Sequence, residues 1–189
     1  MKTPELLSIL KGGDLRSDGR ANEVASMILD DPSLIPEAVK GLSVSDPVIR
    51  GRTADVLEKV ARIHYEKFIP YLPLLLEKAV DDDVYMVRFH LAMLLGYLEV
   101  SGKERRLIVE ALFTLLGDES VFVKSWSIVS LTIIGLNEEE HRESIIDHIE
   151  PLLNSDSKAV KRKAENSLAM LHSRKEIPTG WIKKRSHVI

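Results

Sequence analysis

Histidine and carboxylate side chains are the groups in this sequence that could bind a metal ion or transfer a proton. His64 and Glu66 are two residues apart, and so are His148 and Glu150. On a helix this spacing directs the two side chains of each pair about 200° apart, so one helix could not offer both to an ion. His141 would face the same way as His148, but two helical turns separate them by about 10 Å. We therefore expect no metal site.

Motifs of the common enzyme classes are absent as well. There is no glycine-rich phosphate loop, no G-x-S-x-G nucleophile elbow and no H-E-x-x-H zinc motif. The chain contains no cysteine, which rules out a disulfide framework and a thiolate metal site and fits a reducing compartment. We expect a cytoplasmic protein that has no catalytic residues and no cofactor.

The stretch SWSIVSLTIIGLN, from Ser125 to Asn137, has no charged side chain, although 29% of the residues in the chain are charged. Its length falls short of the roughly 18 to 20 apolar residues that a membrane-spanning helix needs. The amino-terminal sequence MKTPELLSIL also lacks the basic stretch and apolar run of an export signal. We expect neither membrane insertion nor export, and the stretch needs another explanation.

The elements that carry these residues repeat about every 37 residues. Four segments align on an apolar residue followed by a basic one, and the basic positions are 38, 36 and 37 residues apart. These pairs are Ile49-Arg50, Val87-Arg88, Val123-Lys124 and Val160-Lys161. Apolar residues return seven positions after the basic residue (Leu57, Leu95, Leu131, Leu168) and ten positions after it (Val60, Leu98, Ile134, Leu171). At about 100° per residue these positions share one stripe, so each segment is predicted to be an amphipathic helix with one buried face.

Second apolar-periodic segments separate these helices and are predicted to be their partners. They run from Leu34 to Leu42, Phe68 to Val80, Arg105 to Leu116 and Ile145 to Leu153. Pro73 and Pro151 are expected to bend two of them. With residues 1–30 as a degenerate first pair, the pattern predicts an all-α fold: an α-α superhelix, or solenoid, of about five helix pairs. We expect residues 1–172 to form this single domain and residues 173–189 to form a tail.

Helix pairs of this length, with an Asp in the turn and a Val-Arg or Val-Lys entering the second helix, resemble HEAT repeats of the armadillo-like family. The resemblance covers about residues 30 to 172. It implies a ladder of charges between neighbouring repeats, made by the turn acids and the basic residues of the second helices: Asp46, Arg50, Asp83, Arg88, Asp118, Lys124, Asp156 and Lys161. Lysine at two rungs lacks the two-pronged guanidinium, which weakens those rungs.

The side of each second helix opposite the core should be polar in a solenoid unless something binds there. Positions two, five and nine after the basic residue select this side. They are mostly polar near the ends, with Arg52, Asp55 and Lys59 in one repeat and Lys163, Asn166 and Met170 in the last, and largely apolar in the middle, with His90, Met93, Tyr97, Trp126, Val129 and Ile133. The sequence is compatible with a groove that binds a peptide or protein, with neighbouring helices that bury this side through tight curvature, or with a pocket for a small molecule or nucleobase.

The leading functional hypothesis is a non-enzymatic interaction module or scaffold that binds a segment of another protein in this groove. Trp126 and Tyr97 would be its aromatic anchors, and Arg52, Lys59 and Lys163 its polar rim. The alternative is a nucleic-acid-binding protein that resembles the HEAT-like alkylpurine DNA glycosylases, in which Asp55 would stabilise the developing sugar cation. A third resemblance is to HEAT-containing phycobilin lyase subunits. The acidic body of the chain argues against nucleic acid.

The tail has a composition of its own. Residues 173–189 carry a net charge of +4, because five residues are basic and one is acidic, and the remaining body carries -3 - 4 = -7. The tail also contains Ile177, Trp181 and Ile182. We expect it to pack on the acidic body, either capping the last repeat, which is the favoured arrangement, or occupying the apolar groove around Trp126.

Overall fold

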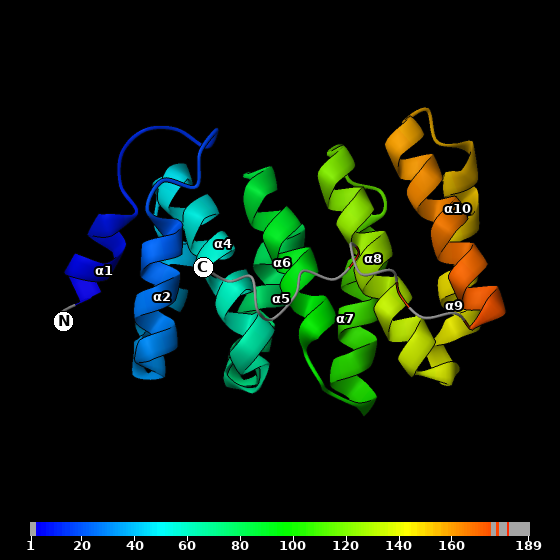
Figure 1. Ribbon diagram of the computed structural model, residues 1–189, viewed down its shortest axis with the longest axis horizontal. Helices are drawn as coiled ribbons and strands as arrows, with labels where there is room; N and C mark the ends of the chain where they lie inside the picture. The colour runs from blue at the N-terminus through cyan, green and yellow to red at the C-terminus, as the bar shows by residue number, and fades with distance from the viewer. Residues whose placement is uncertain (1–2, 175–176, 178–180, 182–189) are drawn as a thin grey trace. The chain divides into compact units, whose positions relative to one another are not determined.

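The computed structural model describes residues 3–174 together with Ile177 and Trp181 (Figure 1). This part of the chain forms ten α-helices and four 3₁₀ segments and contains no strand, so the all-α prediction is confirmed. The chain divides into two compact units, one that ends at Glu99 and one that begins at Val100.

The first unit is built from three successive helix pairs. Its helices are α1 (Thr3–Ile9), α2 (Ala21–Asp30), α3 (Ile35–Val39), α4 (Pro47–His64), α5 (Leu72–Asp81) and α6 (Tyr85–Tyr97). Within each pair the two helices contact each other, and the second helices α2, α4 and α6 also pack side by side (Figure 1). This nearest-neighbour packing is the arrangement of a helical-repeat solenoid.

The second unit contains two pairs built in the same way. Its helices are α7 (Gly102–Leu115), α8 (Val121–Asn137), α9 (Glu139–Ile149) and α10 (Lys158–Ser173). Helix α8 packs against its partner α7, against α9 and against α10, the second helix of the next pair. The uncharged stretch of the sequence therefore lies in a helix that has neighbours on several sides.

The first helices of the pairs are less regular than the sequence predicts. The segments Pro32–Leu34 and Lys40–Ser43 flank α3, Tyr65–Tyr71 precedes α5 and Glu150–Asn154 follows α9, all as 3₁₀ helix. The helices expected over 34–42, 68–80 and 145–153 are therefore α-helical only in part, and Pro73 lies in the first turn of α5. Pro70 and Pro151 lie inside 3₁₀ segments, where the missing amide and the ring are tolerated better than inside an α-helix.

The second helices begin at their predicted places, although their caps differ. Asp46 caps α4, accepting hydrogen bonds from the amides of Val48 (2.8 Å) and Ile49 (3.4 Å), and Pro47 follows as the first helical residue. At α10 the capping side chain is that of Ser157, which accepts from the amide of Val160, and its neighbour Asp156 does not cap the helix.

The predicted inner stripe forms the core. All eight positions, seven and ten residues after the basic residue of each repeat, are buried: Leu57, Leu95, Leu131, Leu168, Val60, Leu98, Ile134 and Leu171. In α8 the buried hydroxyls are also satisfied, because Ser127 donates to the carbonyl of Val123 and Thr132 donates to that of Ile128. No helix among the described residues is long and apolar enough to cross a membrane.

Candidate functional site

The predicted groove residues are distributed over both units. The first unit holds Arg52, Lys59, His90, Met93 and Tyr97, and the second holds Trp126, Val129, Ile133 and Lys163. The two sets have different surroundings within their own units. They are therefore treated as two candidate sites.

Arg52, predicted on the polar rim, is used inside the protein. Its side chain is directed into the loop between α1 and α2, and the residue is only 4% exposed. The guanidinium donates to the backbone carbonyls of Leu10 (2.8 Å), Gly12 (2.6 Å), Asp14 (3.1 Å) and Ser17 (3.4 Å). The placement on the groove rim was wrong because helical angles say nothing about a loop that folds over the helix from 40 residues away.

Lys59 and Tyr97 also belong to an internal polar network. Lys59 Nζ lies 2.6 Å from Oδ2 of Asp55 and 2.6 Å from Oδ1 of Asn22. Next to Lys59 on α4, Glu58 accepts a hydrogen bond from Nε of Arg62 at 2.8 Å and another from the Tyr97 hydroxyl at 3.1 Å. Both Glu58 and Arg62 are buried.

Asp55, Glu58 and His90 could by geometry share a metal ion, because one ligand atom from each lies within 4.8 Å of the other two. The Oδ1 atom of Asp55 is 3.7 Å from Nδ1 of His90. However, Arg62 binds both oxygens of Glu58, and Lys59 binds the other oxygen of Asp55. Two cations thus already compensate two carboxylates, and we interpret the cluster as a structural network between α4 and α6.

The outer side of α6 is buried in this network. His90 is 4% exposed and Met93 is 1% exposed, and the ring of Phe89 lies 4.3 Å from that of His90. Outer positions of α4 and α6 contact each other through the pairs Asp55 with His90 and Glu58 with Tyr97. In the first unit, the predicted groove side is therefore an interface between neighbouring helices.

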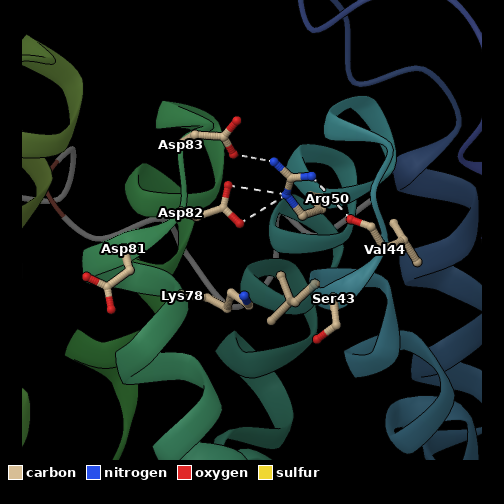
Figure 2. Close-up of a pocket in the computed structure, with 8 residues that line it drawn as sticks. Ser43, Val44, Arg50, Lys78, Asp81, Asp82 and Asp83 are labelled. Atoms are coloured by element: carbon tan, nitrogen blue, oxygen red, sulfur yellow. Dashed lines mark hydrogen bonds and ion pairs between the residues drawn. The ribbon is translucent and has the colours of Figure 1, made fainter.

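A pocket of about 370 Å³ lies at the other end of α4 (Figure 2). Arg50 extends across it to the turn between α5 and α6, where Nε is 3.0 Å from Oδ2 of Asp82 and Nη2 pairs with Asp83. The same guanidinium donates to the carbonyls of Val44 and Ser45. One arginine therefore links the walls of the pocket and joins two helix pairs. The sequence analysis did not identify Asp82 as the buried partner of Arg50.

Two further predicted ladder residues form hydrogen bonds near the turns of their own repeats. Arg88 donates to the carbonyl of Asp82 at 2.6 Å, and Asp118 accepts from the amide of Ser120 at 2.7 Å. Lys124, Asp156 and Lys161 form no ion pair with any residue in the described part of the chain. Lys124 and Lys161 lack the fork that lets Arg50 bind two acids at once.

The histidines differ in part from expectation. His64 and Glu66 approach to 3.8 Å, although helical spacing predicted that they point apart. The reason is that α4 ends at His64 and Glu66 lies in a 3₁₀ segment. His148 stacks on Phe113 with ring centroids 3.6 Å apart and contacts the carbonyl of Ser144.

Glu138, Glu140 and His141 form a second group whose ligand atoms are close enough to share a metal ion, at the start of α9. In this group Arg105 binds Glu138 at 2.8 Å.

The second unit presents an apolar surface on α8 and α10. We define the α8–α10 surface by the residues that form one hydrophobic cluster there: Trp126, Val129, Ile133, Leu136 and Met170. Three of these are predicted groove residues. Val129 from α8 and Met170 from α10 are buried at its centre, and the others are partly buried around them.

The α8–α10 surface is covered by residues from the tail. Trp181, 8% exposed, is buried against Val129 and Met170, and Ile177 packs at the edge. Lys163 Nζ lies 4.3 Å from the centroid of the Trp181 ring, in a cation–π contact. Burial lowers the pKa of Lys163 below its ordinary value. The sequence favoured capping of the last repeat, whereas Trp181 lies on the apolar surface beside Val129; Ile182, the other predicted anchor, lies outside the described residues.

The sequence analysis did not identify Glu58 and Arg62 as members of the polar network in the first unit. Glu58 and Arg62 are four residues apart on α4, as are Asp55 and Lys59, a spacing that brings opposite charges together on one helix. This signal was available. Nothing local to the sequence could show that α6 would bury the pairs.

Comparisons with known proteins show the fold of the chain but not its function. No family model matches the chain, and no curated protein matches it either. Among solved structures, the chain is similar to the complex of CpcE and CpcF of phycocyanin lyase from Nostoc sp., with a TM-score of 0.69, 18% identity, and coverage of 87% of this chain and 96% of that one. It is also similar to a designed armadillo repeat protein in complex with the peptide (KR)4, with a TM-score of 0.65, 17% identity, and coverage of 89% and 81%. The fold is therefore that of HEAT- and armadillo-like repeat proteins.

Proposed function

We propose that the protein is a non-enzymatic interaction module that binds a segment of another protein on the α8–α10 surface. The observation that carries this proposal is the burial of Trp181 on that surface. A tryptophan from outside the repeats already occupies it, packed against Val129 and Met170 and in a cation–π contact with Lys163. Such a site has the features of an interaction hot spot, where a large aromatic side chain fills a desolvated pocket.

The similar structures support a protein or peptide as the partner. One of them is a complex between two chains, CpcE and CpcF, and another is a complex with the peptide (KR)4. In repeat proteins the stacked second helices provide an extended surface for such a chain. Helix-in-groove or extended-segment binding needs no catalytic group.

The geometry in the first unit argues against the glycosylase alternative. Asp55, the carboxylate proposed for that chemistry, is 6% exposed and is bound by Lys59. A catalytic carboxylate must reach the flipped nucleotide, and this one is directed into the network with α6. Binding of a protein segment needs no accessible carboxylate, so the burial of Asp55 is compatible with an interaction module.

The test is affinity capture from the native cell, with the partners quantified by mass spectrometry. We expect Trp126→Ala to reduce the recovery of at least one specific partner. Phe122→Ala is the matched control, because this aromatic residue lies on the same helix, is 61% exposed and is outside the cluster. Circular dichroism checks that both variants fold. Unchanged recovery of every partner with Trp126→Ala would refute the proposal.

A further inference from the structure

The residues that cover the α8–α10 surface belong to a short segment that follows the last repeat. Helix α10 ends at Ser173, and Ile177 and Trp181 lie four and eight residues beyond it. The helices of the repeat bury their inner stripe against each other, with Leu131 and Leu171 at 0% and 1% exposure. Trp181 instead packs on the outer side, against Val129 of α8 and Met170 of α10.

Helix α10 ends in a residue with left-handed backbone conformation. Arg174, directly after α10, has φ 52 and therefore adopts the left-handed conformation, which a non-glycine residue adopts at a cost. Its guanidinium pairs with Glu139 at the start of α9 at 2.5 Å. Both partners are exposed, with 67% and 73% of their side chains accessible. An ion pair this exposed stabilises the turn only weakly.

The contacts of Trp181 define the chemistry that the surface accepts. Val129 and Met170 provide an apolar floor, and Met adapts its shape to aromatic rings. Lys163 stands over the ring, which favours an aromatic side chain over an aliphatic one. Ile177, four residues earlier, occupies the edge beside the partly buried positions of the cluster. A segment with an aliphatic residue and an aromatic residue four positions later reproduces these contacts.

We propose that Ile177 and Trp181 act as an intramolecular competitor: they occupy the partner site, so that the α8–α10 surface is autoinhibited. The inference rests on the proposed function of that surface, and it adds the chemistry of the partner: an aliphatic residue followed four positions later by an aromatic anchor. A short tether gives the segment an effective concentration of about 1 mM. A partner segment with equal contacts at about 1 μM faces a thousandfold disadvantage. Binding therefore requires additional contacts or release of the segment.

The experiment uses the full chain and a synthetic probe. The probe is a fluorescently labelled peptide with the sequence of residues 174–189, and its binding is followed by anisotropy. If the segment leaves about one molecule in ten open, the wild-type chain binds the probe about tenfold more weakly than an open chain does. We expect Trp181→Ala to supply that open chain. The same peptide with alanine at the tryptophan should bind neither protein.

Further variants keep the test independent of one substitution. Arg174→Ala changes only an exposed residue at the turn and should raise affinity for the probe by part of that tenfold factor. The double variant Trp181→Ala/Trp126→Ala should lose the gain, because the probe then lacks part of its surface. Phe122→Ala should match the wild type.

The results separate the two proposals. Equal affinity of the wild type and Trp181→Ala for the probe, or no binding to either, would overturn autoinhibition. A wild-type dimer that Trp181→Ala dissociates, measured by light scattering, would place the segment on a second copy and would also overturn it. The probe titration tests autoinhibition, and the affinity capture with Trp126→Ala tests the proposed function. Either experiment can fail while the other succeeds, so the two proposals can be refuted separately.

Discussion

The buried ion pair between Glu58 and Arg62 offers a sharp test of the network between α4 and α6. The perturbation is Arg62→Met, which keeps the apolar volume and removes the charge. It leaves Glu58, whose side chain is 0% exposed, without the cation that binds both of its oxygens. The remaining hydrogen bond, from the Tyr97 hydroxyl at 3.1 Å, cannot neutralise the carboxylate.

The magnitude follows from this geometry. Removing one partner of a buried pair costs about 3 to 5 kcal/mol, because the other charge stays buried and uncompensated. With a slope of about 2 kcal/mol per molar urea, a loss of about 4 kcal/mol lowers the unfolding midpoint by about 2 M. The double variant Glu58→Met/Arg62→Met removes both charges, and we expect it to recover most of the loss, to within about 1 to 2 kcal/mol of the wild type.

The assay is equilibrium urea unfolding followed by circular dichroism at 222 nm, a wavelength that reports helix. Arg106→Met is the matched control, because Arg106 is an exposed residue of helix α7 with no ion pair among the described residues. It should change stability by less than about 0.5 kcal/mol. The reasoning would be refuted if Arg62→Met shifted the midpoint no more than Arg106→Met, or if the double variant were less stable than Arg62→Met.

Three further predictions concern the core, the amino-terminal loop and the alkaline range. Leu131→Ala, in the fully buried stripe of α8, should cost about 2 to 5 kcal/mol, while Leu107→Ala, at a 39% exposed position, should cost less than about 1 kcal/mol; equal urea midpoints would contradict the core assignment. Arg52→Met should speed hydrogen exchange in residues 10–19, because it removes four hydrogen bonds to backbone carbonyls, and unchanged exchange would mean that the loop is held by other contacts. Burial raises the pKa of Tyr97 above its ordinary value of 10.0, so the stability contributed by the neutral hydroxyl is complete below pH 10 and is lost as the pH rises further. Tyr97→Phe should cost about 1 kcal/mol of unfolding free energy at pH 7. The difference in stability between this variant and the wild type should shrink by up to about 1.4 kcal/mol per pH unit above 10. A difference independent of pH between 9 and 11 would contradict that shift.

The amino-acid sequence by itself determined the helices and their repeat. The positions seven and ten residues after each basic residue, such as Leu95 and Ile134, are all buried, because amphipathic periodicity is a local property that one helix records in its own residues. The cap at Asp46 was readable for the same reason, since a cap involves only residues that are adjacent in the chain. The irregular first helices were less readable, because proline permits either a bent α-helix or a 3₁₀ segment.

The tertiary structure alone decided what covers the outer side of each second helix. Helical angles place Arg52, His90 and Val129 on a common outer side, yet a loop covers Arg52, α4 contacts His90 and Trp181 covers Val129. These coverings come from residues about 35 to 50 positions away in the chain. No local pattern contains that information, because burial depends on which distant element packs there, and this is set by the folded chain as a whole.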